Sequence, residues 1–149
     1  MKRSTVFERG LLFVDTWGWL VLADRLHPLH NQAVQLRRSH TDQGGRLITT
    51  DYVLDESITR LFSRHSFAQA DGFCTVLFAG RRAGVVQVEA VTPERFNRAY
   101  ELRRRYRDKP RISFTDLTSF VVMKELGIRR VLTGDAHFTQ VHLGFQVVP

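Results

Sequence analysis

Cysteine is nearly absent from this sequence, since Cys74 is the only one among 149 residues. A single thiol excludes an internal disulfide framework and any zinc site built from several thiolates. Long apolar runs are also missing: none approaches the ~20 residues that a membrane-spanning helix needs. Residues 1–10 are polar, and the apolar run after them is interrupted by Asp15. We therefore expect no secretory signal, no membrane partner and a cytoplasmic location.

Acidic residues are fewer than basic ones, with 15 Asp and Glu against 22 Lys and Arg, which gives a formal net charge of +7. A protein of this charge attracts polyanions, so nucleic acid is a favoured partner. An acidic protein partner or simple solubility would also explain the positive charge. Hydrophobic residues make up 43% and charged residues 25%, which is typical of globular proteins. The length predicts a single domain over residues 1–149.

Short apolar runs alternate with segments of helical spacing along the chain. We interpret 11–14, 46–49, 85–88, 130–133 and 145–148 as strands. Capping residues mark the starts of the intervening helices, most clearly in Thr92-Pro93-Glu94 and at Ser113. Crossover helices between strands favour parallel pairing. The sequence therefore predicts an α/β fold whose mostly parallel five-stranded sheet has helices on both faces.

Two of the expected helices carry apolar residues that we assign to the core. The first has the stripe Phe67, Ala70, Cys74, Leu77 and Phe78, with Gly80 as its expected end. In the second, Pro110 marks the end, and the inward-facing residues are expected to be Phe96, Ala99, Tyr100 and Tyr106.

Four acidic residues follow, or lie near, the carboxyl ends of the expected strands: Asp15, Glu56, Asp116 and Asp135. In an open parallel sheet this edge is where ligands bind, so we expect the four carboxylates to converge there. Each also has an ordinary structural explanation, as a helix cap, a solvated helix residue or a turn residue. Together they are harder to explain in that way, because four independent coincidences would be needed.

A cluster of carboxylates requires a compensating charge, because like charges a few Å apart raise one another's pKa. Mg²⁺ and Mn²⁺ are hard cations that prefer oxygen ligands. Such an ion can bind a phosphate group and lower the pKa of a bound water, while a basic surface holds the rest of a polyanion. An acidic site in a basic protein therefore indicates metal-assisted chemistry on a polyanion.

The motifs around these acids occur in a characteristic order. They are Phe13-Val14-Asp15-Thr16, then the segment 49–56 ending in Glu56, then Ser113-Phe114-Thr115-Asp116, and finally Thr133-Gly134-Asp135-Ala136-His137-Phe138. From Leu12 to Val148 the chain resembles PIN-domain ribonucleases, and is most similar to VapC-type toxins of toxin–antitoxin pairs.

This resemblance implies a PIN-like three-layer α/β/α fold and a Mg²⁺- or Mn²⁺-dependent endoribonuclease. Asp15 and Asp116 would be the principal metal ligands, and Glu56 and Asp135 would complete the pocket. The hydroxyl residues Thr16, Ser113 and Thr133 would orient these carboxylates. The resemblance also implies a homodimer, an RNA substrate and a small antitoxin protein.

Two departures from the family pattern concern the pocket. Trp17-Gly18-Trp19 follows the first Asp where small residues are common, so the indoles are expected to narrow the entrance. His137 stands where some members have a further Asp. It could contact phosphate or act as an acid, but we interpret it as a packed or solvated histidine.

A basic segment lies toward the end of the helix that begins at Pro93. Its cations are Arg103, Arg104, Arg105, Arg107, Lys109 and Arg111, with Tyr106 among them. This pattern suits a phosphate track with one base-stacking ring, or alternatively a solvated helix end.

Two other functions remain open at this point. One is a catalytically silent PIN-like module that binds RNA or protein. The other is a phosphohydrolase acting through an aspartyl-phosphate, which normally needs an Asp two positions after its nucleophile, where this chain has Trp17.

Overall fold

The computed structural model describes residues 10–149, in which five parallel strands form one sheet in the order β3-β2-β1-β4-β5. Every pair of neighbouring strands is parallel, which confirms the predicted α/β class and makes the sheet wholly rather than mostly parallel. The strands are β1 (Leu11–Val14), β2 (Arg46–Thr50), β3 (Val86–Glu89), β4 (Arg130–Leu132) and β5 (Gln146–Val148).

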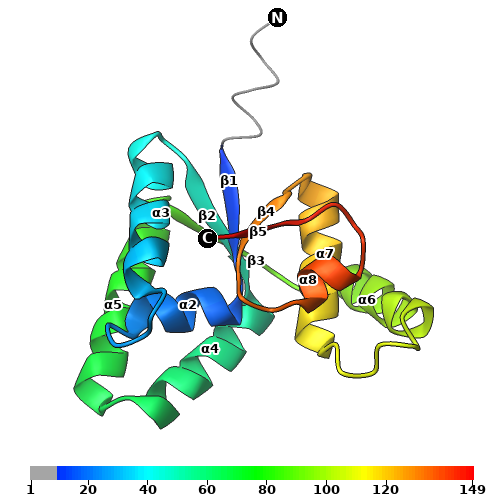
Figure 1. Cartoon of the computed structure of the whole chain (residues 1–149), viewed down its shortest axis with the longest axis horizontal. Coiled ribbons are helices and arrows are strands. Elements are labelled where there is room, and N and C mark those ends of the chain that lie inside the picture. The colour runs from blue at the N-terminus through cyan, green and yellow to red at the C-terminus, as the bar shows by residue number, and fades with distance from the viewer. Residues whose placement is uncertain (1–9) are drawn as a thin grey trace, which may run out of the picture.

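Seven helices cover the two faces of this sheet in the described part of the chain. They are α2 (Thr16–Ala23), α3 (His30–Asp42), α4 (Asp51–Arg64), α5 (Phe67–Arg82), α6 (Pro93–Arg105), α7 (Phe114–Leu126) and α8 (His137–Gln140). Figure 1 shows α2 to α5 on one side of the sheet and α6 to α8 on the other. The result is the three-layer α/β/α arrangement that we expected.

Strand β1 lies at the centre of the sheet because its residues are apolar on both faces. Leu12, Phe13 and Val14 are all fully buried. The chain leaves β1 toward β2 on one side and later returns to β4 on the other side. The carboxyl ends of β1 and β4 therefore form the topological switch point, where open α/β sheets bind their ligands.

Side-chain caps begin the helices where the sequence predicts them. The hydroxyl oxygens of Thr50, Ser66, Thr92 and Ser113 each accept a hydrogen bond from a backbone amide in the first turn of the helix that follows. Helix α7 ends at Gly127, whose φ of 67° lies in the left-handed region that glycine adopts without strain.

The expected stripe of α5 is only partly buried. Ala70, Cys74 and Leu77 are buried, but the Phe67 side chain is 73% exposed and Phe78 is also exposed. The stripe is wider than the surface available beneath it, because α5 lies at the outside of the helical layer (Figure 1). The predicted end at Gly80 was also wrong, since α5 continues to Arg82.

Helix α6 differs from its prediction in a similar way. Ala99 and Tyr106 are buried, whereas Phe96 and Tyr100 are exposed. The ring of Phe96 packs against Phe114 at the start of α7 rather than in the core, with the ring centroids 4.8 Å apart. The helix ends at Arg105, before Pro110, and the ring of Tyr106, the residue after it, is buried.

No helix within residues 10–149 is long and apolar enough to cross a membrane. Most of the polar N-terminal stretch in which we expected no secretory signal, residues 1–9, lies outside the described residues.

Gly18 allows helix α2 to approach the central strands. A Cβ atom at this position would lie 2.5 Å from the carbonyl oxygen of Leu132 and 2.9 Å from a methyl carbon of Val14. We therefore expect Gly18→Ala to lower the free energy of unfolding by ~1–3 kcal/mol, the usual cost of overpacking, in urea denaturation.

Gly72→Ala is the matched control, because nothing lies within 4 Å of a Cβ atom at this position in α5. Alanine is favoured over glycine inside a helix, so this variant should be more stable by ~0.5–1 kcal/mol. Equal effects of the two substitutions would contradict the proposed close approach at Gly18.

Candidate active site

Asp15 follows β1 directly and caps the start of α2. Its side chain is buried, and both of its carboxylate oxygens accept short hydrogen bonds. Oδ1 accepts from the backbone amide of Thr16 at 2.6 Å, and Oδ2 accepts from the hydroxyl of Thr133 at 2.6 Å. The Thr16 hydroxyl, in contrast, has no hydrogen-bond partner in residues 10–149. It is therefore the Thr16 amide, rather than its hydroxyl, that fixes Asp15.

Asp116 enters the same region from the first turn of α7. The Ser113 hydroxyl accepts a hydrogen bond from the Asp116 backbone amide at 3.0 Å, which fixes the helix start and therefore the direction of the carboxylate. Asp116 is only 7% exposed, so it is nearly as buried as Asp15.

Asp135 lies on the loop after β4, and Thr133 connects it to Asp15. The Thr133 hydroxyl accepts a hydrogen bond from the Asp135 backbone amide at 3.0 Å while donating its own proton to Asp15. One buried hydroxyl thus links a carboxylate with the backbone of a segment more than a hundred residues away in the chain.

Glu56 lies on α4 at the rim of this group. Its side chain is 29% exposed and forms an ion pair with Arg60 at 2.9 Å, one helical turn away. Its charge still reaches the buried carboxylates, because it contributes to the raised pKa values of both Asp15 and Asp116.

The electrostatics of the cluster are unfavourable when no cation is bound. Burial raises the pKa of Asp15 to about 6, against the opposing effect of its hydrogen bonds from Thr133 and Thr16. Burial also raises the pKa of Asp116 strongly, and the charges of Asp15, Asp135 and Glu56 raise it further. The site therefore disfavours full ionisation unless positive charge is supplied.

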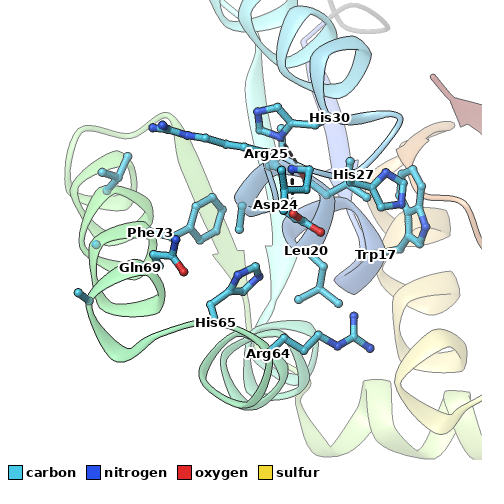
Figure 2. A pocket seen from close by; sticks show the side chains of 17 residues that line it. Trp17, Leu20, Asp24, Arg25, His27, His30, Arg64, His65, Gln69 and Phe73 are labelled. Carbon is cyan, nitrogen blue, oxygen red and sulfur yellow. Dashed lines mark hydrogen bonds between the residues drawn. The ribbon is translucent and has the colours of Figure 1, made fainter.

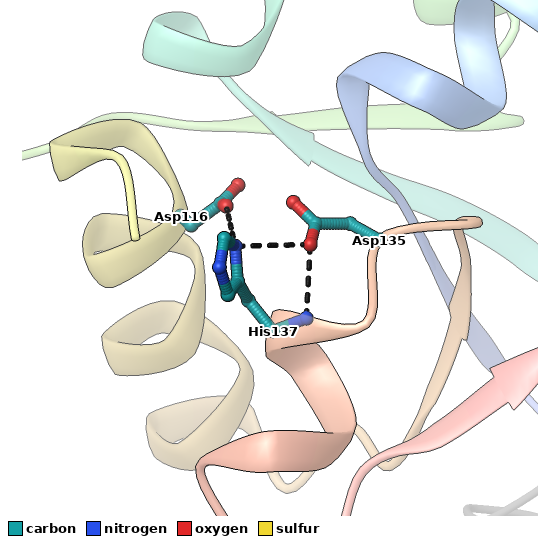
Figure 3. Close-up of side chains that lie close together, drawn as sticks. All are labelled: Asp116, Asp135 and His137. Atoms are coloured by element: carbon teal, nitrogen blue, oxygen red, sulfur yellow. Dashed lines mark hydrogen bonds and ion pairs between the residues drawn. The ribbon is translucent and has the colours of Figure 1, made fainter. Parts of the chain in front are cut away.

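His137, which the sequence led us to interpret as a packed or solvated histidine, lies beside two of the carboxylates. Its Nδ1 atom lies 3.0 Å from Oδ1 of Asp135 and 3.8 Å from Oδ2 of Asp116 (Figure 3). These three residues offer ligand atoms that all lie within 4.8 Å of one another. The available signal was its position two residues after Asp135, at the start of a helix too short to be detected from periodicity.

The basic segment spans the last turn of α6 and the loop after it, and two of its residues, Arg103 and Tyr106, bond to backbone carbonyls. The guanidinium of Arg103 donates hydrogen bonds to the carbonyl oxygens of Tyr106, Lys109 and Ile112. The Tyr106 ring is buried and its hydroxyl donates to the carbonyl of Val141, so it offers no face for stacking a base. The exposed cations of the segment are Arg104, Arg105, Arg107 and Arg111.

A cavity of about 1000 Å³ lies beside the site, bounded by the end of α2, the start of α3, and helices α4 and α5 (Figure 2). Its lining includes Arg25, His27, Arg64 and His65. Trp17 lies at one end of this cavity and also packs against Gly134, beside Asp135. The indole therefore lies between the cavity and the loop that carries Asp135.

Comparison with known proteins agrees with this arrangement. The PIN-domain family profile matches residues 12–143, which is most of the chain. This chain is a PIN-domain protein. The PIN domain is 32% identical over 129 residues to the 23S rRNA-specific endonuclease VapC20 of Mycobacterium tuberculosis, found in strains CDC 1551 and H37Rv. That alignment covers 87% of this chain and 92% of the relative.

Solved structures show the same fold. The crystal structure of Mycobacterium tuberculosis VapC20, described as a sarcin-ricin loop cleaving toxin, superposes with a TM-score of 0.77, covering 93% of this PIN domain and 99% of that chain. VapBC2 from Rickettsia felis, bound to a DNA fragment from its promoter, has a TM-score of 0.69 at 11% identity, with the same coverage. The second likeness concerns the fold alone. The PIN domain is thus a homologue of a VapC-type endonuclease.

We expect Asp116→Asn to stabilise the metal-free protein in a pH-dependent way. The raised pKa of Asp116 means that the folded state keeps a proton that the unfolded chain releases above about pH 4. Stability is therefore lost as the pH rises above that value, and asparagine, which does not ionise, avoids the loss. Urea denaturation in EDTA should show a gain of the order of 1–3 kcal/mol at pH 7.5 and almost none at pH 4.

Asp55→Asn serves as the control, because Asp55 is an exposed residue of α4 on the solvent side. An equal gain for both variants, or a gain for Asp116→Asn that does not depend on pH, would contradict the electrostatic interpretation.

Proposed function

We propose that this PIN domain is a Mg²⁺- or Mn²⁺-dependent endoribonuclease and the toxin of a toxin–antitoxin pair. The observation that carries the proposal is the burial of Asp15 and Asp116, two like charges from distant segments, at the switch point of the sheet. A protein gains no stability from such a pair. A divalent cation removes the repulsion, and the oxygen-rich donor set suits a hard ion.

Each residue has a defined part in this proposal. Asp15 and Asp116 are the principal metal ligands, and Asp135 and Glu56 complete the pocket from the loop after β4 and from α4. When bound, the metal polarises the phosphodiester and makes a water molecule more acidic. Thr133 and Ser113 hold the ligands in place, Thr133 through its bond to Asp15 and Ser113 through the start of α7.

RNA is the substrate that the charge distribution favours. The net charge of +7 attracts a polyanion, and the exposed arginines at the end of α6 and in the loop after it offer contacts to phosphates. The Mycobacterium tuberculosis relative is named for its specificity toward 23S rRNA, so a structured ribosomal RNA is the first substrate to test. We also propose a homodimer and an antitoxin as protein partners, on the basis of the relationship to VapC20.

We expect Asp15→Asn and Asp116→Asn to abolish metal-dependent cleavage. Loss of a partner that merely orients a metal ligand costs 10–100-fold in activity or affinity, so loss of the ligand itself should cost more than ~100-fold. Cleavage should be measured by gel electrophoresis on a panel that includes a sarcin-ricin loop hairpin, with Mg²⁺, with Mn²⁺ and with EDTA.

Asp55→Asn again provides the control, since it removes one carboxylate of α4 outside the pocket and should leave the rate unchanged. Cleavage that survives both ligand substitutions would refute the site. A wild-type protein that binds RNA but never cleaves it would instead support the silent binding module.

Within the basic segment, Arg107→Ala should weaken RNA binding without loss of stability, because this side chain is exposed. If Arg107 contacts a phosphate, the slope of log affinity against log salt should fall by about 0.7 for a single strand. Filter binding or fluorescence anisotropy at several salt concentrations would measure it, with the uncleaving Asp116→Asn protein as the background.

Arg103→Ala is the contrasting variant, because this guanidinium satisfies three backbone carbonyls. Its removal should lower the free energy of unfolding by ~1–3 kcal/mol. A change in salt slope for Arg103→Ala with unchanged stability would contradict the structural role assigned to Arg103 and would indicate that it contacts a phosphate.

A further inference from the structure

His137 is held beside the carboxylates by the backbone of its own loop. Its amide donates a hydrogen bond to Oδ1 of Asp135 at 2.9 Å, which turns the first residue of α8 toward the site. The imidazole then lies between Asp135 and Asp116, as Figure 3 shows. The ring is partly accessible, with a side-chain exposure of 24%, but its Nδ1 atom is buried.

The position of Nδ1 suits metal coordination better than a hydrogen bond. Although it lies 3.0 Å from Oδ1 of Asp135, it makes no aligned hydrogen bond to any group within residues 10–149. Adjacent ligands of a six-coordinate ion, each ~2.1 Å from the metal, are ~3 Å apart. The separation of Nδ1 from Asp135 matches this value, and its 3.8 Å separation from Asp116 lies within the range of the same coordination sphere.

Three other histidines of the chain have a ring nitrogen bonded to the backbone elsewhere. Nδ1 of His30 bonds to the carbonyl of Val21, Nε2 of His40 bonds to that of Arg46, and Nδ1 of His27 accepts from the amide of Leu29. Of the two that remain, His65 lines the cavity of Figure 2 and His142 is exposed. Among the histidines, therefore, only His137 belongs to the group of ligand atoms within 4.8 Å of one another.

An imidazole changes which metals a site favours. Carboxylate oxygens suit Mg²⁺ and Mn²⁺ alike, whereas nitrogen ligands suit transition metals, among which Mn²⁺ binds most weakly. Mg²⁺ strongly prefers oxygen and retains its water molecules. A nitrogen ligand in the pocket therefore shifts its preference from Mg²⁺ toward Mn²⁺.

We infer that His137 is a direct ligand of the metal, which adds one imidazole nitrogen to the carboxylates of Asp116 and Asp135 and makes the site selective for Mn²⁺ over Mg²⁺. This inference rests on the metal dependence in the proposed function, and it adds a ligand that the proposal does not require.

Two measurements on the full chain separate the inference from the proposed function. Isothermal titration calorimetry with Mn²⁺ and with Mg²⁺ tests whether the site binds metal. Electron spin-echo envelope modulation of the Mn²⁺-loaded protein tests whether a nitrogen atom is bonded to the ion. We expect Mn²⁺ binding with nitrogen modulation, and replacement of its ¹⁴N frequencies by ¹⁵N frequencies after selective ¹⁵N-histidine labelling. The labelled wild-type protein gives this answer without any substitution.

His137→Asp keeps a ligand but makes it an oxygen. It should abolish the nitrogen modulation. It should also reduce the ratio of Mn²⁺ to Mg²⁺ affinity by ~10-fold or more, because loss of a group that only orients a metal ligand already costs at least ~10-fold in metal affinity. His142→Asn is the matched control. His142 is exposed and has a φ of 53°, a conformation that asparagine tolerates, so this variant should behave as the wild type.

The outcomes distinguish the two ideas. Mn²⁺ binding without nitrogen modulation would overturn the inference and leave the proposed metal dependence standing, and would identify His137 as an ion-pair partner of Asp135 instead. Nitrogen modulation that persists in His137→Asp would assign the ligand to another histidine and also overturn the inference. Absence of binding by either metal would refute the proposed function together with the inference.

Discussion

The hydroxyl of Thr133 is the contact on which the arrangement of the site depends. It donates to the carboxylate of Asp15 and accepts from the amide of Asp135, so it fixes the end of β1 relative to the loop after β4. The contact exists because β1 and β4 are neighbours in the sheet although they are distant in sequence. It also partly offsets the burial that raises the pKa of Asp15, since the bond favours the ionised carboxylate.

The rest of the fold supports this contact by burying the strands and helices that carry the site. Strand β1 is covered on both faces, and α7 is buried along most of its length, from Asp116 to Met123. A rigid frame can hold carboxylates near one another in spite of their mutual repulsion. Flexible loops would move apart and so relieve that repulsion.

The fold and the convergence of the acids were predictable because local signals agreed with one another. The apolar run at 11–14, the caps at Thr92 and Ser113, and the alternation of elements each indicate a parallel sheet, and such a sheet brings its carboxyl ends to one edge. Burial on the outer helices was not predictable in the same way. Phe67 and Phe96 follow a helical period, but a period says which residues share a face and not whether a neighbour covers that face. The stacking role suggested for Tyr106 was wrong, and the proximity of His137 to Asp116 was missed, because both depend on segments far away in the chain.

The three carbonyl contacts of Arg103 have a consequence for the connection between α6 and α7. They bind residues 106, 109 and 112 to the end of α6, so this stretch is held in one conformation although it lies at the surface. A basic loop that is free to move loses conformational entropy whenever it closes on a ligand. Here that loss is already incurred during folding. Arg107 and Arg111 therefore extend from backbone that is already fixed, so only their side chains would have to be ordered on contact with a ligand.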